Sequence, residues 1–232
     1  MRTSWWTRIL DFISPRLCGV CGERLAPTER SLCTVCMMHL PRTSYQYKPK
    51  DNIMAQAFWH LTPVERAAAL TYYQPHSEMA NAIYQLKYGG RPDIGEDLGR
   101  LMAVEMSYAN FFEGIEALLP VPLAKKRLRQ RGYNQSEQLA YGIYEKTGLP
   151  IITKALIRKE FLQSQTQLGR QERQENVKDI FQLVDDRELK HKHVLLVDDI
   201  CTTGATLIAC VDAIKQVENI RISVLTFGFT HS

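Results

Sequence analysis

The stretch that decides the fold is His193-Val194-Leu195-Leu196-Val197-Asp198-Asp199-Ile200-Cys201-Thr202-Thr203-Gly204-Ala205-Thr206-Leu207. Residues 194–197 form an apolar run without polar alternation, which is typical of a strand buried on both faces of a parallel sheet. Apolar residues then recur at helical spacing from Leu207 to Val217, so a tight turn joins this strand to a helix. Ligands of open α/β sheets bind at the carboxyl ends of strands, and this turn is therefore the first candidate site.

The turn carries groups that suit a sugar phosphate. Its threonine hydroxyls can donate to phosphate oxygens, and Gly204 allows backbone N–H groups to approach an anion closely at the start of the helix. The carboxylates of Asp198 and Asp199 can accept hydrogen bonds from the vicinal hydroxyls of a ribose.

This pattern resembles the 5-phosphoribosyl-1-pyrophosphate (PRPP) loop of type I phosphoribosyltransferases. That loop has four apolar residues, two acids, a variable small residue and then Thr-Thr-Gly-x-Thr. The resemblance implies that the PRPP-binding residues are Asp198, Asp199, Cys201, Thr202, Thr203, Gly204, Ala205 and Thr206.

Two other interpretations compete for the same stretch. Residues 196–199 also resemble the opening strand of a response-regulator receiver domain, but most of a receiver would have to follow Asp199, and only a short part of this 232-residue chain does. A purely structural strand with incidental acids is disfavoured, because two carboxylates buried at a strand end without a ligand are costly.

Length and composition predict one medium-sized domain with a small accessory unit. The chain has 232 residues, of which 45% are hydrophobic, and a net charge of +4, which alone does not imply a nucleic-acid partner. No run approaches the roughly 18 apolar residues of a membrane span. The apolar segment at residues 5–13 is interrupted by Arg8 and Asp11, so we expect an amphipathic segment that docks on the chain, with a membrane surface as the alternative. The predicted location is the cytoplasm.

Two Cys-x-x-Cys pairs near the N-terminus predict a metal centre. Four thiolates, from Cys18, Cys21, Cys33 and Cys36, can converge on one tetrahedral Zn²⁺. Such a shell has no open position, so the zinc would be structural rather than catalytic. A redox dithiol, unligated cysteines and His39 as a substitute ligand are the alternatives.

The expected order of elements is that of an α/β domain with a mainly parallel sheet flanked by helices, preceded by the cysteine unit. Residues 41–50 are polar and bounded by proline, which predicts a linker. We expect an N-terminal unit over residues 1–62 and a phosphoribosyltransferase-like domain over residues 63–232. Strands are predicted near residues 66–73, 116–121, 152–158, 180–184, 194–197 and 222–228, and helices over residues 77–87, 94–106 and 134–147. The first helix should turn Met79, Ile83 and Leu86 inward, and the third should begin with the capping box Asn134-Gln135-Ser136-Glu137, in which Asn134 is the N-cap.

A basic segment follows the strand that ends at Val121. It places five cations within seven residues, in what we predict to be a loop: Lys125, Lys126, Arg127, Arg129 and Arg131. If both strands are parallel, this segment lies at the same sheet edge as the acidic pair, where it would bind the pyrophosphate of PRPP. A solvated basic loop and a nucleic-acid patch are the alternatives.

A second polar segment, residues 163–178, lies between two predicted strands. Long polar segments inside compact domains are usually lids or disordered. Its charges alternate, so an exposed loop or a helix with ion pairs four residues apart is the alternative to a lid.

The order of motifs along most of the chain resembles the ComF/GntX family of phosphoribosyltransferase-like proteins, which is associated with competence and the use of external DNA. The matching motifs are an apolar-Pro-x-x-Cys-x-x-Cys opening at residues 9–21, Leu86-Lys87-Tyr88-Gly89, Pro120-Val121-Pro122-Leu123, Arg131-Gly132-Tyr133-Asn134-Gln135, the lid pattern Gln165, Leu168, Arg173, Asn176 and Phe181, and residues 198–206.

The resemblance implies a Mg²⁺-assisted displacement of pyrophosphate from PRPP by an acceptor that the sequence does not identify. Phosphate contacts are expected from the basic segment, the lid and the second motif, at Lys87, Arg127, Arg131, Arg173 and Lys178. No residue stands out as a general base. The alternative is a nonenzymatic competence factor that binds PRPP or single-stranded DNA and recruits DNA-uptake partners.

Overall fold

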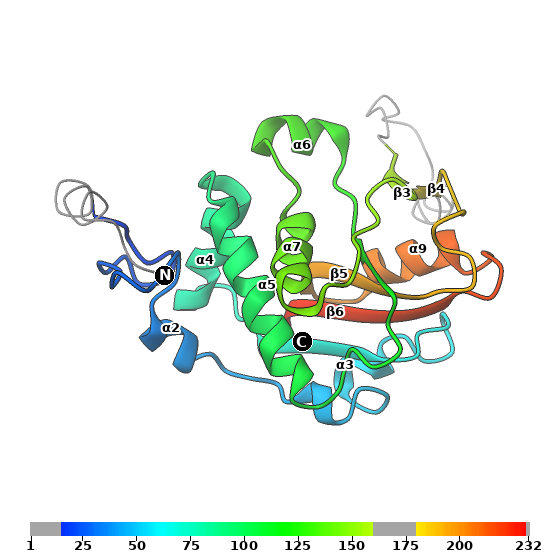
Figure 1. The fold of residues 1–232 in the computed structure, drawn as a ribbon, viewed down its shortest axis with the longest axis horizontal. Coiled ribbons are helices and arrows are strands. Elements are labelled where there is room, and N and C mark those ends of the chain that lie inside the picture. Colours follow the sequence, from blue (N-terminus) through cyan, green and yellow to red (C-terminus); the bar gives the residue numbers. More distant parts are fainter. Residues whose placement is uncertain (1–14, 160–179, 231–232) are drawn as a thin grey trace, which may run out of the picture.

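The computed structural model describes residues 15–159 and 180–230, and its centre is a parallel sheet (Figure 1). Four strands pair in the order β1-β6-β5-β2, and every neighbouring pair is parallel. The predicted α/β fold with a mainly parallel sheet is therefore confirmed. The strands are β1 (Ala67–Tyr72), β2 (Ala117–Pro120), β5 (His193–Cys201) and β6 (Arg221–Phe229).

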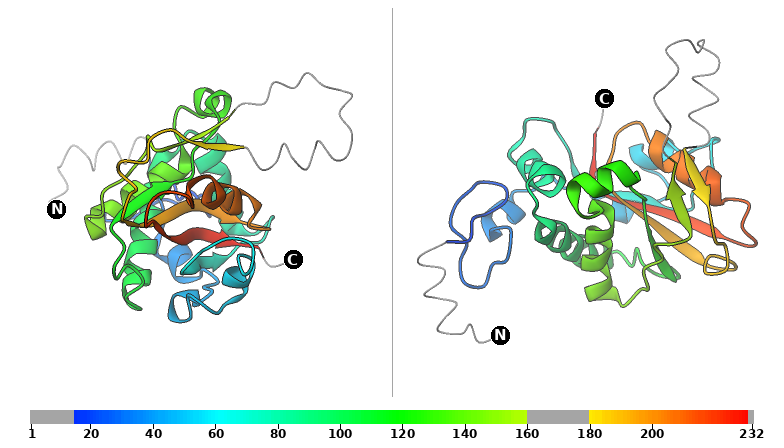
Figure 2. Two further views of the ribbon diagram at one scale, coloured as in Figure 1. Left: turned by 90° about the vertical axis from the view of Figure 1, so that its right-hand side faces the viewer. Right: turned by 90° about the horizontal axis from the view of Figure 1, so that it is seen from above.

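Helices cover both faces of this sheet (Figure 2). Helices α5 (Pro92–Ser107) and α7 (Gln135–Thr147) pack on one face, while α9 (Ala205–Ile214) lies on the other. The short helix α3 (Ile53–Gln56) packs against β1. Both faces of the sheet are therefore buried, which explains why residues 194–197 are apolar without alternation.

Two glycines let α5 and α7 approach each other closely. A Cβ atom at Gly99 would lie 2.1 Å from the carbonyl oxygen of Leu139, and one at Gly142 would lie 2.1 Å from that of Glu96. Any side chain at either position would force the helices apart. This close packing fixes α7, whose N-terminus faces the acidic pair.

The predicted helix boundaries near the site are confirmed. Helix α4 (Glu78–Tyr88) ends at Gly89, and its buried residues include the predicted Met79, Ile83 and Leu86. Helix α7 begins after Asn134, whose side chain accepts a hydrogen bond from the Ser136 N–H, and it ends at Gly148 in the left-handed region.

Three details differ from the sequence predictions. Strand β5 continues through Cys201, because its pairing with β6 extends through Asp198 and Ile200, so the acids lie inside the strand. The basic segment is not a loop but helix α6 (Lys125–Arg131), built from good helix formers and closed by Gly132 at φ 81°.

The third difference concerns two short strands predicted to extend the main sheet. β3 (Leu156–Arg158) and β4 (Phe181–Leu183) instead pair with each other as a separate antiparallel sheet. Only an isolated parallel bridge between Leu118 and Ile151 extends the main sheet beyond β2 in the described residues. Both strands of the small sheet pack against α9.

The segment predicted as a linker packs along the edge strand β1. The Thr43 N–H donates to the carbonyl of Leu70, and the Asn52 side chain donates to the carbonyl of Ala67. The ring of Tyr45, at the start of the 3-10 helix η1 (Tyr45–Tyr47), is buried in the core, as is Phe58. Helix α2 (Thr34–Met38) carries the last cysteine of the N-terminal unit.

The amphipathic segment at residues 5–13 and the predicted lid residues Arg173 and Lys178 lie outside the described residues. Within the described ranges, none of the helices has the length and apolar character needed to cross a membrane.

Candidate functional site

The acidic pair, Asp198 and Asp199, lies near the end of β5, where both side chains are buried and accept hydrogen bonds. Asp198 is 7% exposed, and its Oδ1 accepts hydrogen bonds from the Ser136 hydroxyl at 2.8 Å and from the Asp199 N–H at 2.9 Å. Ser136 lies in the first turn of α7, so the helix cap positions a donor for the first carboxylate. Sequence reasoning treated Ser136 only as part of a capping motif and missed this contact.

Asp199 is 5% exposed and faces a different set of groups. Its Oδ1 accepts from the Ile200 N–H at 2.7 Å, and its Oδ2 lies 2.9 Å from Nζ of Lys87. No donor among the described residues makes a well-aligned hydrogen bond to the buried Oδ2. This oxygen is therefore buried, and the ammonium group of Lys87 balances its charge.

The electrostatics of the pair favour an incoming positive charge or donor. Burial and the adjacent charge of Asp199 raise the pKa of Asp198, while the Ser136 hydroxyl, the Asp199 N–H and Lys87 oppose that rise. Two neighbouring carboxylates in a dry setting repel each other. A divalent cation or several hydroxyl donors would stabilise both in the ionised form.

The turn after β5 presents polar groups to solvent. Thr202, Thr203 and Thr206 are exposed, and Gly204 adopts φ 78° at the start of α9. The Thr203 hydroxyl accepts from the Ala205 N–H at 3.4 Å. These hydroxyls and N–H groups surround a helix N-terminus, an arrangement that suits an anion such as a phosphate.

Cys201 precedes this turn and is almost fully buried. Burial, and then the negative charge of Asp198, raise the pKa of the Cys201 thiol to about 12. The thiol therefore remains protonated at neutral pH, and only the backbone of this residue is suited to contact a ligand.

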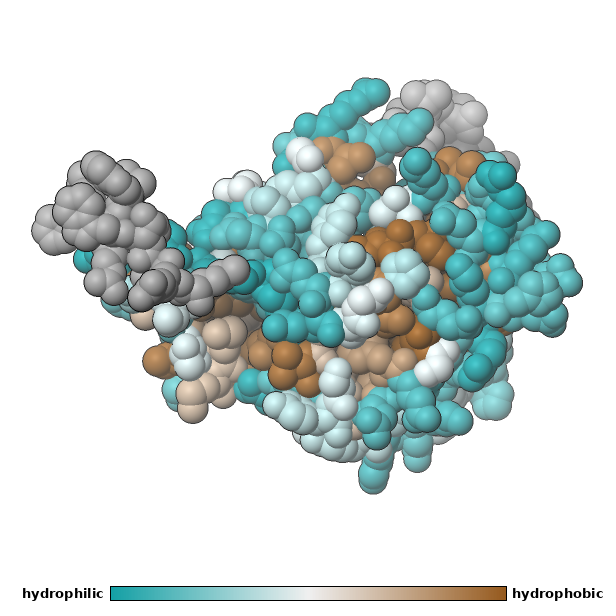
Figure 3. Space-filling model, in the orientation of Figure 1, coloured by the Kyte–Doolittle hydropathy of each residue, from teal (hydrophilic) through white to brown (hydrophobic). Residues whose placement is uncertain are grey.

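A cationic pocket lies between α4 and α6. Its volume is about 350 Å³, and its lining includes Lys87, Arg127 and Arg131. Arg131 stacks on the Tyr88 ring at 5.1 Å and donates to the Gln135 side chain, which connects α6 to both neighbouring helices. The structure thus brings the three described phosphate-contact candidates together, and Lys87 touches both this pocket and the acidic pair. Figure 3 shows a hydrophilic surface over much of α6.

Arg158 is a further cation near the acids that sequence reasoning missed. It lies on β3, with its guanidinium 5.4 Å from the centre of the Phe181 ring. Burial and the nearby charge of Arg127 lower the pKa of Arg158, whereas Asp198 acts in the opposite direction. A single arginine in a short strand gives no sequence signal, because only the pairing of β3 with β4 places it here.

The four cysteines of the N-terminal unit converge as predicted. The sulfur atoms of Cys18, Cys21, Cys33 and Cys36 all lie within 4.8 Å of one another. Backbone N–H groups of Val20 and Cys33 point at the Cys18 sulfur at 3.5 and 3.3 Å. This cluster can hold a metal such as zinc, since four sulfur ligands at tetrahedral positions complete its coordination shell.

The thiol chemistry also fits a cation at this cluster. Burial raises the pKa of the Cys18 thiol, but the hydrogen bonds from surrounding N–H groups outweigh it and lower the pKa to about 7. The pKa of Cys36 is raised by burial and by the neighbouring sulfurs. A bound divalent metal would stabilise all four thiolates together.

The cysteine unit is anchored to the two helices that follow β1. The Ser31 N–H donates to Asp97 on α5 at 2.8 Å, and the Asn81 side chain on α4 donates to the carbonyl of Val20 at 3.3 Å. Gly19 lies close to Ile94 on α5, and a Cβ atom added at Gly19 would be 2.4 Å from the Ile94 side chain. The unit therefore supports the helix that carries Lys87.

Comparison with known families supports this arrangement. Residues 123–228, which hold the basic helix, the acidic pair and the threonine-rich turn, match the phosphoribosyl transferase domain family. This part of the chain is therefore similar to phosphoribosyl transferase domains, as the residues of the loop after β5 predicted.

Three curated proteins are similar to the chain over much of its length. The chain is 29% identical over 199 residues to the DNA utilization protein YhgH of Escherichia coli O157:H7. The aligned residues make up 82% of the chain and 80% of that relative. The YhgH protein of Salmonella typhimurium is 26% identical to the chain, and the aligned residues make up 83% of the chain and 88% of that relative. Competence protein F of Haemophilus influenzae is 31% identical over 140 residues, which make up 59% of the chain and 60% of that relative. The chain is thus similar to these DNA-utilisation and competence proteins, and its residues 123–228 are similar to phosphoribosyl transferase domains.

Two solved structures are similar over 62% of this chain, at 21% identity. They are an allosteric regulatory enzyme of purine biosynthesis, with a TM-score of 0.43, and a glutamine PRPP amidotransferase from B. subtilis, with a TM-score of 0.42. The chain spans less than a third of the length of each, at 29% and 30%. The fold class rests on the strand order and the family match rather than on these likenesses.

Proposed function

We propose that the protein binds PRPP at the carboxyl edge of its sheet and transfers phosphoribose to an acceptor with release of pyrophosphate. One observation carries the proposal: Nζ of Lys87 lies 2.9 Å from Oδ2 of Asp199. This contact joins the acidic end of β5 to the cationic pocket between α4 and α6, so the two charged halves of a PRPP site are contiguous.

Each part of the ligand has a chemically matched partner. Asp198 and Asp199 accept hydrogen bonds from the two ribose hydroxyls, and the turn at residues 202–206 binds the 5-phosphate with threonine hydroxyls and backbone N–H groups. Arg127 and Arg131 line the pocket for the pyrophosphate, with Lys87 between the two halves.

The reaction breaks the bond between the anomeric carbon and the pyrophosphate oxygen. Fixed cations lower its barrier because they stabilise the negative charge that develops on the departing group. The carboxylates hold the ribose ring so that the anomeric carbon faces an acceptor, which replaces a bimolecular encounter with a fixed geometry. Arg173 and Lys178 lie outside the described residues and remain candidate phosphate contacts of a lid.

Two metal ions accompany the proposal. Zinc on Cys18, Cys21, Cys33 and Cys36 would fold the N-terminal unit, since the four sulfurs are already convergent. Mg²⁺ would enter with PRPP and neutralise pyrophosphate oxygens, and the carboxylates of Asp198 and Asp199 supply negative charge beside the cationic pocket. The adjacent Cys-x-x-Cys pairs favour a metal site over disulfides, so the proposed location is a reducing compartment such as the cytoplasm.

A second candidate function rests on helix α6. Most of its side chains are exposed, and five of its seven residues are cationic, which suits the phosphate backbone of single-stranded DNA. On this alternative the protein would be a nonenzymatic competence factor that binds PRPP or DNA and recruits DNA-uptake partners, in line with the names of its relatives.

Pyrophosphate release tests the enzymatic proposal. Purified protein is incubated with labelled PRPP, Mg²⁺ and a fractionated metabolite pool, and the label is followed into pyrophosphate and a new phosphoribosyl product. Release that depends on one fraction and disappears with Asp198→Asn supports transfer. Release in no fraction, by protein shown to bind PRPP, contradicts the enzymatic role and leaves the binding role.

Salt dependence separates pyrophosphate from DNA at α6. Arg131→Ala should weaken PRPP binding even at a salt concentration that abolishes nonspecific DNA association, because the pyrophosphate contact is made inside a pocket. Arg187→Ala, at an exposed arginine that is paired with Asp185 and does not line the cationic pocket, is the matched control. An Arg131 variant that loses only DNA binding would refute the pyrophosphate role and favour the competence-factor alternative.

A further inference from the structure

Tyr133 connects the basic helix to the helix that carries Lys87. It follows Gly132, which ends α6 at φ 81°, and its hydroxyl donates to the carbonyl of Leu86 at 2.5 Å. Leu86 immediately precedes Lys87 in the last turn of α4, the part of a helix where carbonyl groups need partners from elsewhere. The Tyr133 hydroxyl therefore satisfies the end of α4 from outside that helix.

The turn between α4 and α5 needs such a contact because it contains two glycines. Gly89 ends α4, and Gly90 follows it at φ 66°. Glycine loses more conformational freedom on folding than any other residue, so contacts from outside the turn must offset that loss. Burial raises the pKa of the Tyr133 hydroxyl, and a hydrogen bond from the backbone of Arg91 opposes that rise. This hydroxyl thus contacts the chain on both sides of the two glycines.

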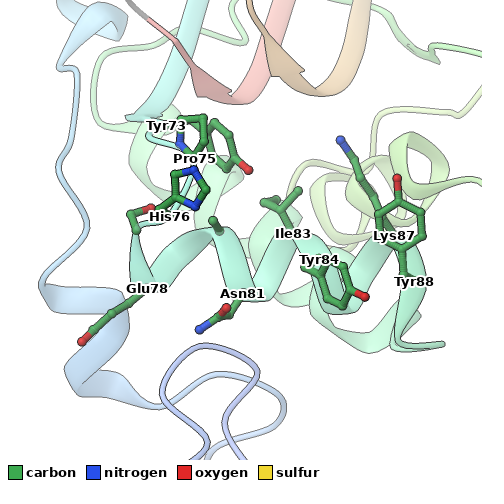
Figure 4. A pocket seen from close by; sticks show the side chains of 11 residues that line it. Tyr73, Pro75, His76, Glu78, Asn81, Ile83, Tyr84, Lys87 and Tyr88 are labelled. Carbon is green, nitrogen blue, oxygen red and sulfur yellow. The ribbon is translucent and has the colours of Figure 1, made fainter.

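Lys87 depends on this end of α4 for its contact with the acidic pair. Its side chain extends from the last turn of the helix toward the carboxyl ends of the strands (Figure 4), and its Nζ lies 2.9 Å from Oδ2 of Asp199. An ion pair of this kind must offset the side-chain entropy that is lost when a long lysine is held in one geometry. Fraying of the last turn would add backbone entropy to that cost, so a formed turn favours the ion pair.

Tyr133 presents its hydroxyl from a fixed part of the chain. The side chain of the next residue, Asn134, is 2% exposed and donates to the carbonyl of Val121, just after β2, at 3.0 Å. Ser136, two residues further on, donates to Asp198 at 2.8 Å. One short segment therefore reaches both carboxylates, the first directly through Ser136 and the second through the helix end that Tyr133 holds.

We propose that Tyr133 is a positioning residue for PRPP binding and that it acts by holding Lys87 against Asp199. The proposal rests on the proposed function, because PRPP is the ligand whose affinity it concerns. Tyr133 also lines the cationic pocket, but its hydroxyl is engaged by the backbone of the turn between α4 and α5. Its effect on the ligand therefore passes through Lys87 and not through a contact of its own.

Tyr133→Phe tests the proposal, because it removes the hydroxyl and keeps the ring that packs beside α4. Isothermal titration of the full chain with PRPP and Mg²⁺ should show binding that is roughly threefold to tenfold weaker, the range that one neutral hydrogen bond contributes. Ser107→Ala is the matched control, since it removes a hydroxyl that donates to the carbonyl of Ala103 at the last residue of α5. The control should bind PRPP as the unmodified chain does.

A double-mutant cycle with Lys87→Met separates positioning from general support of the fold. In that background, Tyr133→Phe should change PRPP affinity by less than roughly twofold, because the group that Tyr133 positions is gone. The pH dependence supplies a second measurement. Lys87 helps to lower the pKa of Asp198, so the loss of PRPP binding on acidification should begin at higher pH in Tyr133→Phe, as in Lys87→Met.

Two results would overturn the positioning role even when the wild type binds PRPP. One is a Tyr133→Phe variant that binds as tightly as Ser107→Ala, and the other is an equal loss of affinity with and without Lys87. If the wild type does not bind PRPP, the proposed function fails, and urea unfolding of the same variants decides the inference. Tyr133→Phe and Lys87→Met should then be coupled by more than roughly twofold in the equilibrium constant of unfolding, and additive changes would show that Tyr133 does not hold Lys87.

Discussion

The contact between Lys87 and Asp199 gives the sharpest test of how the site is held together. Lys87→Met removes the ammonium group and keeps an apolar side chain of similar length. The Lys87 side chain is 23% exposed and that of Asp199 is 6% exposed, so the change leaves a buried carboxylate without its counter-ion.

The expected loss follows from these exposures. Removing one partner of a fully buried ion pair costs about 3–5 kcal/mol, and an exposed pair is worth about 0–1 kcal/mol. Because Lys87 reaches solvent, we expect Lys87→Met to lower the free energy of unfolding by an intermediate amount, about 1–3 kcal/mol. The same change should raise the pKa of Asp198 further, since Lys87 now helps to lower it.

Urea unfolding of a double-mutant cycle measures the coupling. Asp199→Asn in the Lys87→Met background should recover part of the loss, because the amide needs no counter-ion. Lys215→Met is the matched control: its ion pair with Asp212 spans 2.7 Å, but both side chains are about one-third exposed, at 34% and 36%. That control should change stability by less than about 1 kcal/mol. If the two site changes add within about 0.5 kcal/mol, the pair is not coupled and the reasoning is refuted.

Three further predictions concern pH, metal and backbone. Because burial and Asp199 raise the pKa of Asp198, the native state holds that proton more tightly than the unfolded chain. The free energy of unfolding should therefore fall as the pH rises above the ordinary aspartate value, and Asp198→Asn should flatten this fall in urea titrations; parallel curves for variant and wild type would contradict it. Mass analysis should find one zinc per chain, and Cys36→Ser should lose it; chelation should unfold the N-terminal unit, because structural zinc supplies roughly 10 kcal/mol or more to such units. Retention of zinc after all four cysteines are changed to serine would reject the site. Gly204→Ala should cost about 1–2 kcal/mol in thermal unfolding, since φ 78° is strained for alanine; unchanged stability would show that the turn does not need this conformation.

Local sequence signals were enough to predict much of the fold. The apolar run before Asp198 predicted a buried parallel strand, and the spacing of Met79, Ile83 and Leu86 predicted the inner face of α4. Asn134 predicted the start of α7, because its side chain caps the helix without help from distant residues. The cysteine pairs predicted the metal cluster for the same reason, since their spacing brings the sulfurs together locally.

Two of the features that sequence reasoning missed depend on contacts between distant segments, and a third depends on local helical preference. Strand β5 runs past its acids because β6 supplies partners for Asp198 and Ile200. The cations of residues 125–131 indicated a loop, yet Lys, Arg, Leu and Gln are good helix formers, and their helical preference prevailed. Arg158 reaches the site only through the antiparallel pairing of β3 with β4.

The pocket along α4, whose lining includes Tyr73, Ile83 and Lys87, also could not be predicted from the sequence. Tyr84 and Tyr88 follow the spacing of one helix face, but that spacing does not say whether a partner covers the face. In the structure both side chains are largely exposed, and the Tyr88 ring contacts the guanidinium group of Arg131 on α6.

PRPP binding tests the central claim most directly. Isothermal titration with PRPP and Mg²⁺ compares the wild type with Asp198→Asn, Asp199→Asn and, as a control, Asp212→Asn on the outer part of α9. Hydrogen bonds to charged groups contribute about 1.5–3 kcal/mol, so each site variant should bind roughly tenfold to a hundredfold more weakly than the wild type and the control. A wild-type protein that does not bind PRPP, or folded site variants that bind it as tightly as the control, would contradict the account.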